Sequence, residues 1–198
     1  MIMEINTVCD KKFIKLHELS LDGGRKYVVA SRKSAEKLAR ETDAVTCFVI
    51  MNGKLLLQYE YRFPARDFLL SPPAGLIDEE DRGCDDMLIR TAIREINEET
   101  GAVVTEKDRV FVVNECVFSS PGMTDESNAL VCAVIDDFDV SALNNSGAVG
   151  GETFDGFVLA DEEKARKLIA RGKDDNGKYF PVYTYAALLY YLGGAWKD

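Results

Sequence analysis

The sequence predicts an α/β/α sandwich around a mixed sheet, with an N-terminal β-hairpin region in front of it. Strand-like segments come first, helix-like segments then alternate with further strands, and an Asn52-Gly53 pair marks a tight antiparallel turn. With 198 residues, 46% of them hydrophobic, the chain has enough apolar side chains for such a core. We expect residues 1–42 to form the hairpin region and residues 43–198 to form the main domain.

The individual elements follow from local apolar patterns and turn signals. The Leu-Asp-Gly-Gly sequence at 21–24 separates the strands of a first hairpin, and Asn52-Gly53 separates those of a second. The predicted strands are 12–21, 25–32, 45–51, 54–61, 68–70, 109–118, 128–136 and 153–159. The predicted helices are 34–41, 86–100, 161–171 and 182–192, and the segment 144–151, rich in Asn, Ser and Gly, is expected to be a loop.

Charge and cysteine content narrow the class of partner. A formal net charge of −10 argues against nucleic acid or an anionic membrane surface. No segment has 18 consecutive apolar residues, so we expect no membrane span.

Five cysteines without a Cys-x-x-Cys pair favour reduced thiols in a cytoplasmic protein, with Cys47 and Cys132 in the core. The single histidine, His17, cannot build a zinc site with such scattered cysteines and is expected in a strand.

The most informative stretch is Arg94-Glu95-Ile96-Asn97-Glu98-Glu99-Thr100-Gly101. In a helix ended by Gly101, Glu95, Glu98 and Glu99 share one face, because they are three and four residues apart. Like charges this close repel, and a hard cation such as Mg²⁺ would remove that cost. Taken alone, such a row is more often a solvated face than a metal site.

This stretch and Pro73-Ala74-Gly75 upstream resemble the Nudix hydrolase signature, in which a glycine precedes an Arg-Glu-apolar-any-Glu-Glu-any-Gly-apolar helix. The match is complete from Arg94 to Ala102. Eighteen residues separate Gly75 from Arg94 where the pattern has thirteen, so five residues are inserted around 80–85, and Asp86 falls where the pattern has its first glutamate.

The resemblance implies the fold named above and a Mg²⁺ site, or a Mn²⁺ site, on the glutamate helix. It implies that metal is bound by the backbone carbonyl of Ala74 and by Glu95, Glu98 and Glu99, and that Arg94 orients a metal-binding glutamate.

Two further motifs resemble those of ADP-ribose and ADP-sugar pyrophosphatases. Gln58-Tyr59-Glu60-Tyr61-Arg62 places Arg62 thirteen positions before Gly75, where it would clamp a substrate phosphate, although a surface arginine is an equally good interpretation. The Ser119-Ser120-Pro121-Gly122 loop resembles the Ser-Pro-Gly loop of that group. The candidate substrate-binding residues are therefore Arg62, Arg66, Gly75, Pro121, Gly122 and Glu126. Ser71-Pro72 stands where the group usually has Glu-Leu, which leaves the exact substrate open.

In relatives, a glutamate in the loop before the last strand acts as the general base. Glu152, in the glycine-rich loop 147–152, is the candidate here, with Asp155 and Glu126 as alternatives and a solvated loop glutamate as the competing interpretation.

These resemblances imply Mg²⁺-dependent hydrolysis of the diphosphate bond of a nucleoside diphosphate sugar, with ADP-ribose yielding AMP and ribose 5-phosphate. Alternatives are a pyrophosphohydrolase that acts on nucleoside triphosphates or dinucleotides, and a non-catalytic nucleotide-sensing module. Relatives form homodimers whose N-terminal strands complete the partner's site, so region 1–42 is expected to serve dimerisation or substrate contact.

Overall fold

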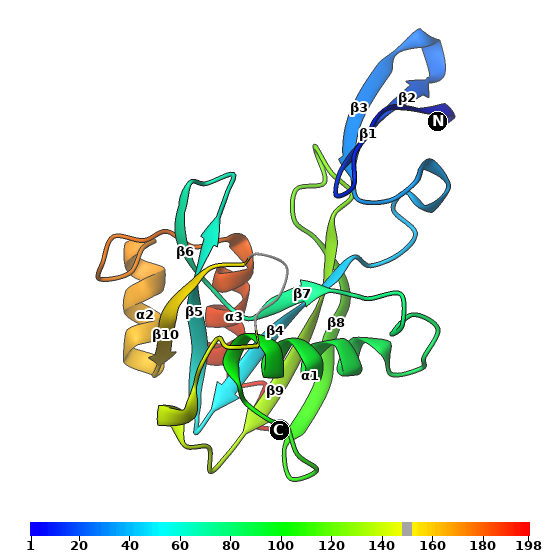
Figure 1. Ribbon diagram of the computed structural model, residues 1–198. Helices are drawn as coiled ribbons and strands as arrows, with labels where there is room; N and C mark the ends of the chain where they lie inside the picture. The colour runs from blue at the N-terminus through cyan, green and yellow to red at the C-terminus, as the bar shows by residue number, and fades with distance from the viewer. Residues whose placement is uncertain (148–151) are drawn as a thin grey trace.

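The computed structural model describes residues 1–147 and 152–198, and its central feature is a mixed sheet (Figure 1). The strand order is β10-β5-β4-β9-β8, with β6 paired to β5 and β7 paired to β4. Its strands are β4 (Ala44–Met51), β5 (Lys54–Arg62), β6 (Asp67–Ser71), β7 (Ala74–Leu76), β8 (Arg109–Phe118), β9 (Ser127–Ile135) and β10 (Phe154–Ala160). β4 and β9 run parallel, while the other neighbours are antiparallel. The predicted Asn52-Gly53 turn joins β4 and β5, and both of its residues have positive φ.

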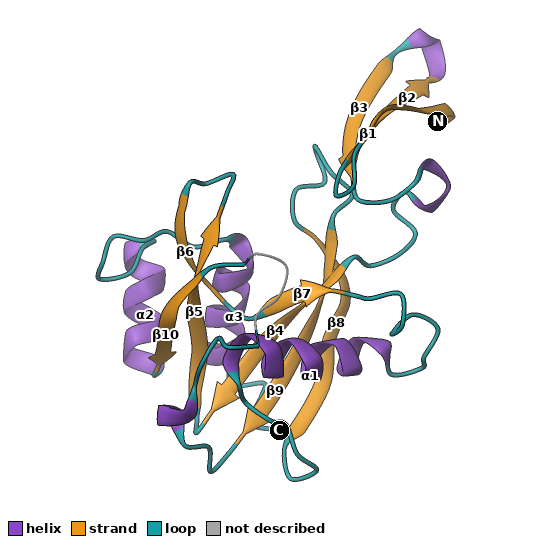
Figure 2. Ribbon diagram, in the orientation of Figure 1, coloured by secondary structure: helices purple, strands orange, loops and turns teal. Residues whose placement is uncertain are grey.

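Helices cover both faces of this sheet (Figure 2). Helix α1 (Met87–Thr100) packs on one face, and α2 (Glu162–Arg171) and α3 (Val182–Gly193) pack on the other. Strand β4 shows the alternation that this requires, since Cys47 and Val49 join the core under α1 whereas Phe48 and Ile50 join the core under α3. The predicted α/β/α sandwich is confirmed.

The predicted helix ends agree with the observed caps in two helices. Gly101 ends α1 with φ of 71°, and its N–H donates to the carbonyl of Asn97. The Asp161 carboxylate accepts from the Lys164 N–H at the start of α2. Asp86 stands at the N-cap position of α1 without a side-chain capping bond. Among the residues that the structure describes, no helix has the length and apolar character to cross a membrane.

The N-terminal region is a three-stranded antiparallel sheet that extends away from the main domain (Figure 1). It consists of β1 (Ile2–Asp10), β2 (Lys15–Leu21) and β3 (Lys26–Ser31). The sequence analysis missed β1, because most of its residues are exposed and no buried face imposes an alternating pattern. It also began β2 too early, since residues 11–14 form a turn in which Lys11 N–H donates to the carbonyl of Ile14.

The predicted helix at 34–41 is wrong. Only one turn of 3₁₀ helix forms, at Ala35–Lys37, and Ala39 then takes a positive φ of 57° that a continuing helix cannot accommodate. The segment is held by Asp125, whose carboxylate accepts from the Ala39 N–H. A tertiary contact has therefore replaced the local helical pattern.

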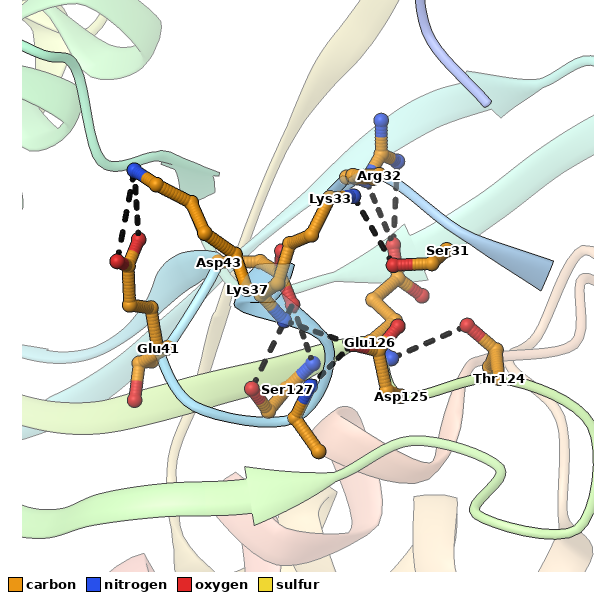
Figure 3. Close-up of polar contacts among 12 residues, drawn as sticks. Ser31, Arg32, Lys33, Lys37, Glu41, Asp43, Thr124, Asp125, Glu126 and Ser127 are labelled. Atoms are coloured by element: carbon orange, nitrogen blue, oxygen red, sulfur yellow. Dashed lines mark hydrogen bonds and ion pairs between the residues drawn. The ribbon is translucent and has the colours of Figure 1, made fainter. Parts of the chain in front are cut away.

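A buried group of charges joins the N-terminal sheet to the main domain (Figure 3). We call Lys33, Asp43 and Asp125 the junction cluster. The Lys33 ammonium lies 2.7 Å from Asp43 and 3.2 Å from Asp125, and each of these three side chains is at most 7% exposed. Asp43 also accepts from the N–H of Ser127, at the start of β9. The cluster ties the end of β3 to the segments before β4 and β9.

We expect the Lys33→Met variant to lose about 3–5 kcal/mol of unfolding free energy, because it leaves two buried carboxylates without their cation. Urea denaturation would measure the change. Lys26→Met is the matched control: it removes an ion pair to Glu18 whose lysine is 64% exposed, and it should cost much less than Lys33→Met because water screens the pair. Equal losses in the two variants would contradict a stabilising role for the junction cluster.

Candidate active site

Helix α1 buries most of its glutamate row. Glu95 is 7% exposed and Glu99 is 1% exposed, while the Glu98 side chain is 27% exposed. This row therefore does not form a fully solvated charged face. Burial of two carboxylates on one helix is costly unless other groups compensate their charge, so the partners of each glutamate determine what the site can hold.

Glu99 is held by groups from two strands and one loop. One carboxylate oxygen accepts from the side-chain amide of Gln58 on β5 and, at 3.1 Å, from the backbone N–H of Ala74 on β7. The side-chain amide of Asn145 donates to the backbone carbonyl of Glu99. The second carboxylate oxygen, Oε1, is buried and has no hydrogen-bond partner among the described residues. That free lone-pair direction suits a metal ion.

Arg94 compensates the other two glutamates. Its guanidinium donates to Glu95 at 2.6 Å and to Glu98 at 3.2 Å. It also donates to the backbone carbonyl of Leu76 at 2.9 Å and forms an ion pair with Asp78 at 3.2 Å. Because planar guanidinium groups fix the orientation of the carboxylates they bind, Arg94 holds the glutamate row against the β7 loop.

The five-residue insertion is anchored to the same helix. Its Asp81 is 8% exposed and accepts from the hydroxyl of Thr91 at 3.3 Å. The same carboxylate lies 3.6 Å from both Arg90 and Arg94. Asp86 lines a separate cavity of about 470 Å³ at the start of α1, away from the glutamate row. The inserted loop therefore supplies a carboxylate to the arginine through Asp81.

Gly75 lies so close to Glu95 that a side chain at position 75 would displace the Glu95 carboxylate. A Cβ atom at this position would stand 2.0–2.2 Å from the Glu95 carboxylate atoms. Sub-van-der-Waals distances of this kind force the carboxylate to move. A glycine at position 75 is thus the condition for Glu95 to reach the β7 loop.

Two residues of the site were missed by the sequence analysis, Gln58 and Glu60. Both are buried on β5, and because they are two positions apart they project from the same face of the strand, together with Arg62. The Arg62 guanidinium lies 2.6 Å from Glu60. The available signal was polar residues at alternate positions directly after the run Leu55–Leu57, where a buried strand would otherwise continue with apolar side chains.

The site contains more negative charge than its arginines neutralise. Burial raises the pKa of Glu95 to about 7, against the opposing effect of Arg94. Burial likewise raises the pKa of Glu60 to about 7, against the effect of Arg62, and raises the pKa of Glu99 well above its ordinary range with help from Glu60. Burial also raises the pKa of Glu152. Burial thus favours the neutral form of each carboxyl, even where an arginine is paired with it.

The donor set fits a hard divalent cation. It consists of carboxylate oxygens, one of them buried and unpartnered, beside a glycine that leaves room for Glu95. Within residues 1–147 and 152–198, no three acidic, histidine or cysteine side chains already converge as a ligand set. The reason is that Glu95 and Glu99 are engaged by Arg94 and Gln58, so binding would require rotation of these carboxylates.

A cavity of about 700 Å³ opens beside the glutamate helix. Five of the predicted site residues line it: Arg62, Ala74, Gly75, Glu126 and Glu152. Phe13 also lines it and is 66% exposed. Residues 148–151 of the predicted base-carrying loop lie outside the described residues.

The structure does not bring every predicted residue to this cavity. Arg66, Pro121 and Gly122 are not among its lining residues, and neither are the α1 residues Arg94, Glu95, Glu98 and Glu99, which lie behind Ala74 and Gly75. Arg66 ends the turn after β5 with a φ of 54°, and the carbonyl of Gly122 accepts from the hydroxyl of Tyr27 in the N-terminal sheet. Asp155, the alternative base, is an exposed residue of β10.

Comparison with known proteins assigns the chain to a family. Residues 40–181 match the NUDIX domain, and the chain belongs to the Nudix family. An uncharacterised Nudix hydrolase of Schizosaccharomyces pombe is 32% identical over 114 residues, which are 57% of this chain and 51% of that protein. A Caenorhabditis elegans protein assigned as nudix hydrolase 2 is 37% identical over 99 residues, 49% of this chain and 40% of its own. The chain thus spans about half the length of the curated relatives it matches.

The fold itself is also that of a solved enzyme. The crystal structure of an ADP compounds hydrolase superposes with a TM-score of 0.62 at 18% identity, over 100% of this chain and 94% of the other. Nudix hydrolases act on nucleotide-derived substrates and generally use divalent metal ions.

We expect Gly75→Ala to weaken Mg²⁺ binding by about 10–100-fold, as loss of a positioned metal ligand usually does, because the new methyl group displaces the Glu95 carboxylate. Calorimetric titration with MgCl₂ would measure the affinity. Gly193→Ala, at a position where a Cβ meets no atom within 4 Å, is the control and should bind as wild type does. Wild-type affinity in Gly75→Ala would exclude Glu95 as a ligand.

Metal binding should stabilise the protein more at high pH than at low pH. In the metal-free protein, Glu60 and Glu95 have pKa values of about 7 instead of the ordinary 4.5. Their contribution to stability is fully present below about pH 4.5 and is lost as the pH rises through 7. Cations bind the deprotonated forms, so the increase in Tm on adding Mg²⁺ should be larger at pH 8 than at pH 5.5. An equal increase at both pH values would contradict this.

Proposed function

We propose that this protein is a Mg²⁺-dependent pyrophosphohydrolase that cleaves the diphosphate bond of a nucleoside diphosphate sugar, with ADP-ribose yielding AMP and ribose 5-phosphate. One observation carries the proposal: the buried carboxylates of Glu95 and Glu99 lie against Gly75 and Ala74, which line the same cavity as Arg62 and Glu152. A solved protein of the same fold is named for the hydrolysis of ADP compounds, the class that includes ADP-ribose.

The metal would be held by Glu95, Glu98, Glu99 and the backbone carbonyl of Ala74, and Mn²⁺ could take the place of Mg²⁺. When bound, it supplies positive charge for the diphosphate and acidifies a water molecule. No other group on this part of α1 offers comparable positive charge, since Arg94 is already engaged by Glu95, Glu98 and Asp78.

The chain's own residues would then bind the substrate and move the proton. Arg62 lines the cavity and would bind a phosphate oxygen, exchanging its contact with Glu60. Glu152 would accept a proton from the attacking water while the oxygen of that water forms a bond to one phosphorus. The bond between that phosphorus and the bridging oxygen breaks, and the other phosphate leaves with the bridging oxygen. The raised pKa of Glu152 makes it a stronger proton acceptor than an ordinary glutamate.

A homodimer and a cytoplasmic location belong to the same proposal. The N-terminal sheet exposes several apolar side chains, including Ile2, Met3, Val8 and Val28. A second copy could cover them and reach the cavity wall that Phe13 forms. Sedimentation equilibrium would then give twice the 22.0 kDa mass of one chain.

The test is a substrate screen over ADP-ribose, other nucleotide sugars, dinucleotides and nucleoside triphosphates with Mg²⁺, with products separated by ion exchange. We expect ADP-ribose or a related nucleotide sugar to give the highest kcat/KM. Glu98→Gln, Glu99→Gln and Glu152→Gln should each lower kcat by about 100-fold or more, the usual contribution of a positioned acid–base group or metal ligand.

The matched control is Glu163→Gln, which changes a carboxylate that is 77% exposed on α2 and should keep full rate. Equal turnover in wild type and the α1 variants would reject the metal site. Turnover confined to triphosphates or dinucleotides would reject the substrate class, and nucleotide binding without turnover would favour a sensing module.

A further inference from the structure

Part of the large cavity is built by polar residues that the proposed reaction does not use. Tyr183 is the second residue of α3, Asn128 is the second residue of β9, and Glu126 directly precedes β9. All three line the cavity together with Arg62. In the sheet order β4 lies between β5, which carries Arg62, and β9, so this group stands on the far side of β4 from Arg62. We call Tyr183, Asn128 and Glu126 the distal subsite.

The hydrogen bonds of Tyr183 leave its oxygen as an acceptor. Its hydroxyl donates to the side-chain carbonyl of Asn128 at 3.2 Å. The amide of Asn128 in turn donates to the hydroxyl of Thr46 at 2.9 Å, and both Asn128 and Thr46 are buried. With its single proton used, the Tyr183 oxygen can only accept a hydrogen bond from a ligand.

Glu126 presents a second acceptor. Its Oε1 atom receives two hydrogen bonds from the Arg32 guanidinium, both at 3.1 Å, and its Oε2 atom receives one from the hydroxyl of Ser119 at 3.3 Å. Oε2 therefore keeps a free lone pair. Figure 3 shows Glu126 beside Asp125 and Arg32 beside Lys33, so the junction cluster fixes the chain on both sides of this ion pair.

Two fixed acceptors select the chemistry of the ligand. Burial, with a contribution from Glu126, raises the pKa of Tyr183 to about 12, so its phenol keeps its proton on Asn128 over the whole physiological range. A phosphate or carboxylate, which offers only acceptors at neutral pH, would leave both oxygens unpaired and could gain a donor here only by drawing Arg32, which also lines the cavity, away from Glu126. A pair of adjacent hydroxyl groups supplies the two donors that are needed.

We propose that Tyr183 and Glu126 bind the vicinal hydroxyls of a ribose ring of the substrate and so select hydroxyl-bearing over phosphate-bearing ends. This inference rests on the proposed function, because it places the diphosphate near Arg62 on β5 and the ribose on the far side of β4, at the start of β9. A carboxylate that accepts from ribose hydroxyls is a general means of recognising an unphosphorylated nucleotide sugar. The ribose could belong to the nucleoside or to the terminal sugar, and both present the same diol.

The test measures binding separately from turnover. The ligand is ADP-ribose with a methylene group in place of the bridging oxygen, and it is titrated calorimetrically into the protein with Mg²⁺. Two further analogues lack the 2-hydroxyl, one on the adenosine ribose and one on the terminal ribose. We expect one of the two to bind wild type about 10-fold more weakly, as loss of a hydrogen bond to a charged group does, and that analogue identifies the ribose.

The variants show whether the distal subsite causes the discrimination. In Glu126→Gln and in Tyr183→Phe, the affinity difference between the parent ligand and that analogue should fall to about 2-fold or less. The reason is that the altered side chain and the missing ligand hydroxyl are the two partners of one hydrogen bond, so removing the second partner costs little once the first is lost. Tyr185→Phe is the control on the same helix, since Tyr185 does not line the cavity, and it should keep the full difference. Thermal unfolding of each variant checks that it is folded.

Several results would overturn the inference. One is that wild type binds both deoxy analogues as tightly as the parent ligand, and another is that it does not bind the parent ligand. A third is that the 10-fold affinity difference between the parent ligand and the analogue persists in both variants although they are folded. Hydrolysis of unmodified ADP-ribose by wild type alongside any of these results would leave the proposed function intact. Failure to hydrolyse any nucleotide sugar, with the discrimination present, would instead reject the function.

Discussion

The site depends on the buried carboxylate of Glu99. It is 1% exposed, and its partners come from β5 through Gln58 and from β7 through the backbone of Ala74. Such a charge tolerates little displacement, because each lost partner would leave an ion in an apolar core. Strand β5, which carries Arg62, and strand β7, which carries Gly75, are thereby held at fixed positions relative to helix α1.

The folding of this region and its chemistry make opposite demands. A stable core would avoid carboxyls at positions 60, 95 and 99, where burial raises the pKa of each. The two arginines offset part of this cost, and each does so by holding a glutamate in place. The remaining excess of negative charge would favour a divalent cation there, so the cost of burying these carboxyls and the proposed affinity for metal have one origin.

Local features of this chain could be predicted from sequence, whereas features that depend on distant segments could not. The end of α1 at Gly101 and the Asn52-Gly53 turn follow from backbone preferences of single residues. The helix expected at 34–41 gave way because Asp125, far along the chain, captures the Ala39 N–H. Glu60 was within a recognised motif, but its burial depends on how β5 packs against α1. Tyr183 lies 55 residues from its partner Asn128 in sequence, and no local pattern joins them.

The inserted loop before α1 has a consequence for how such enzymes can vary. Asp81 fastens the loop to Arg90, Thr91 and Arg94, so the register between the glycine and the helix is set by ion pairs and not by the number of intervening residues. Loop closure entropy changes only slowly with length. Residues can therefore be gained or lost here during evolution while the carboxylates keep their places, and the cavity at the start of α1 gives such insertions a surface on which to diversify.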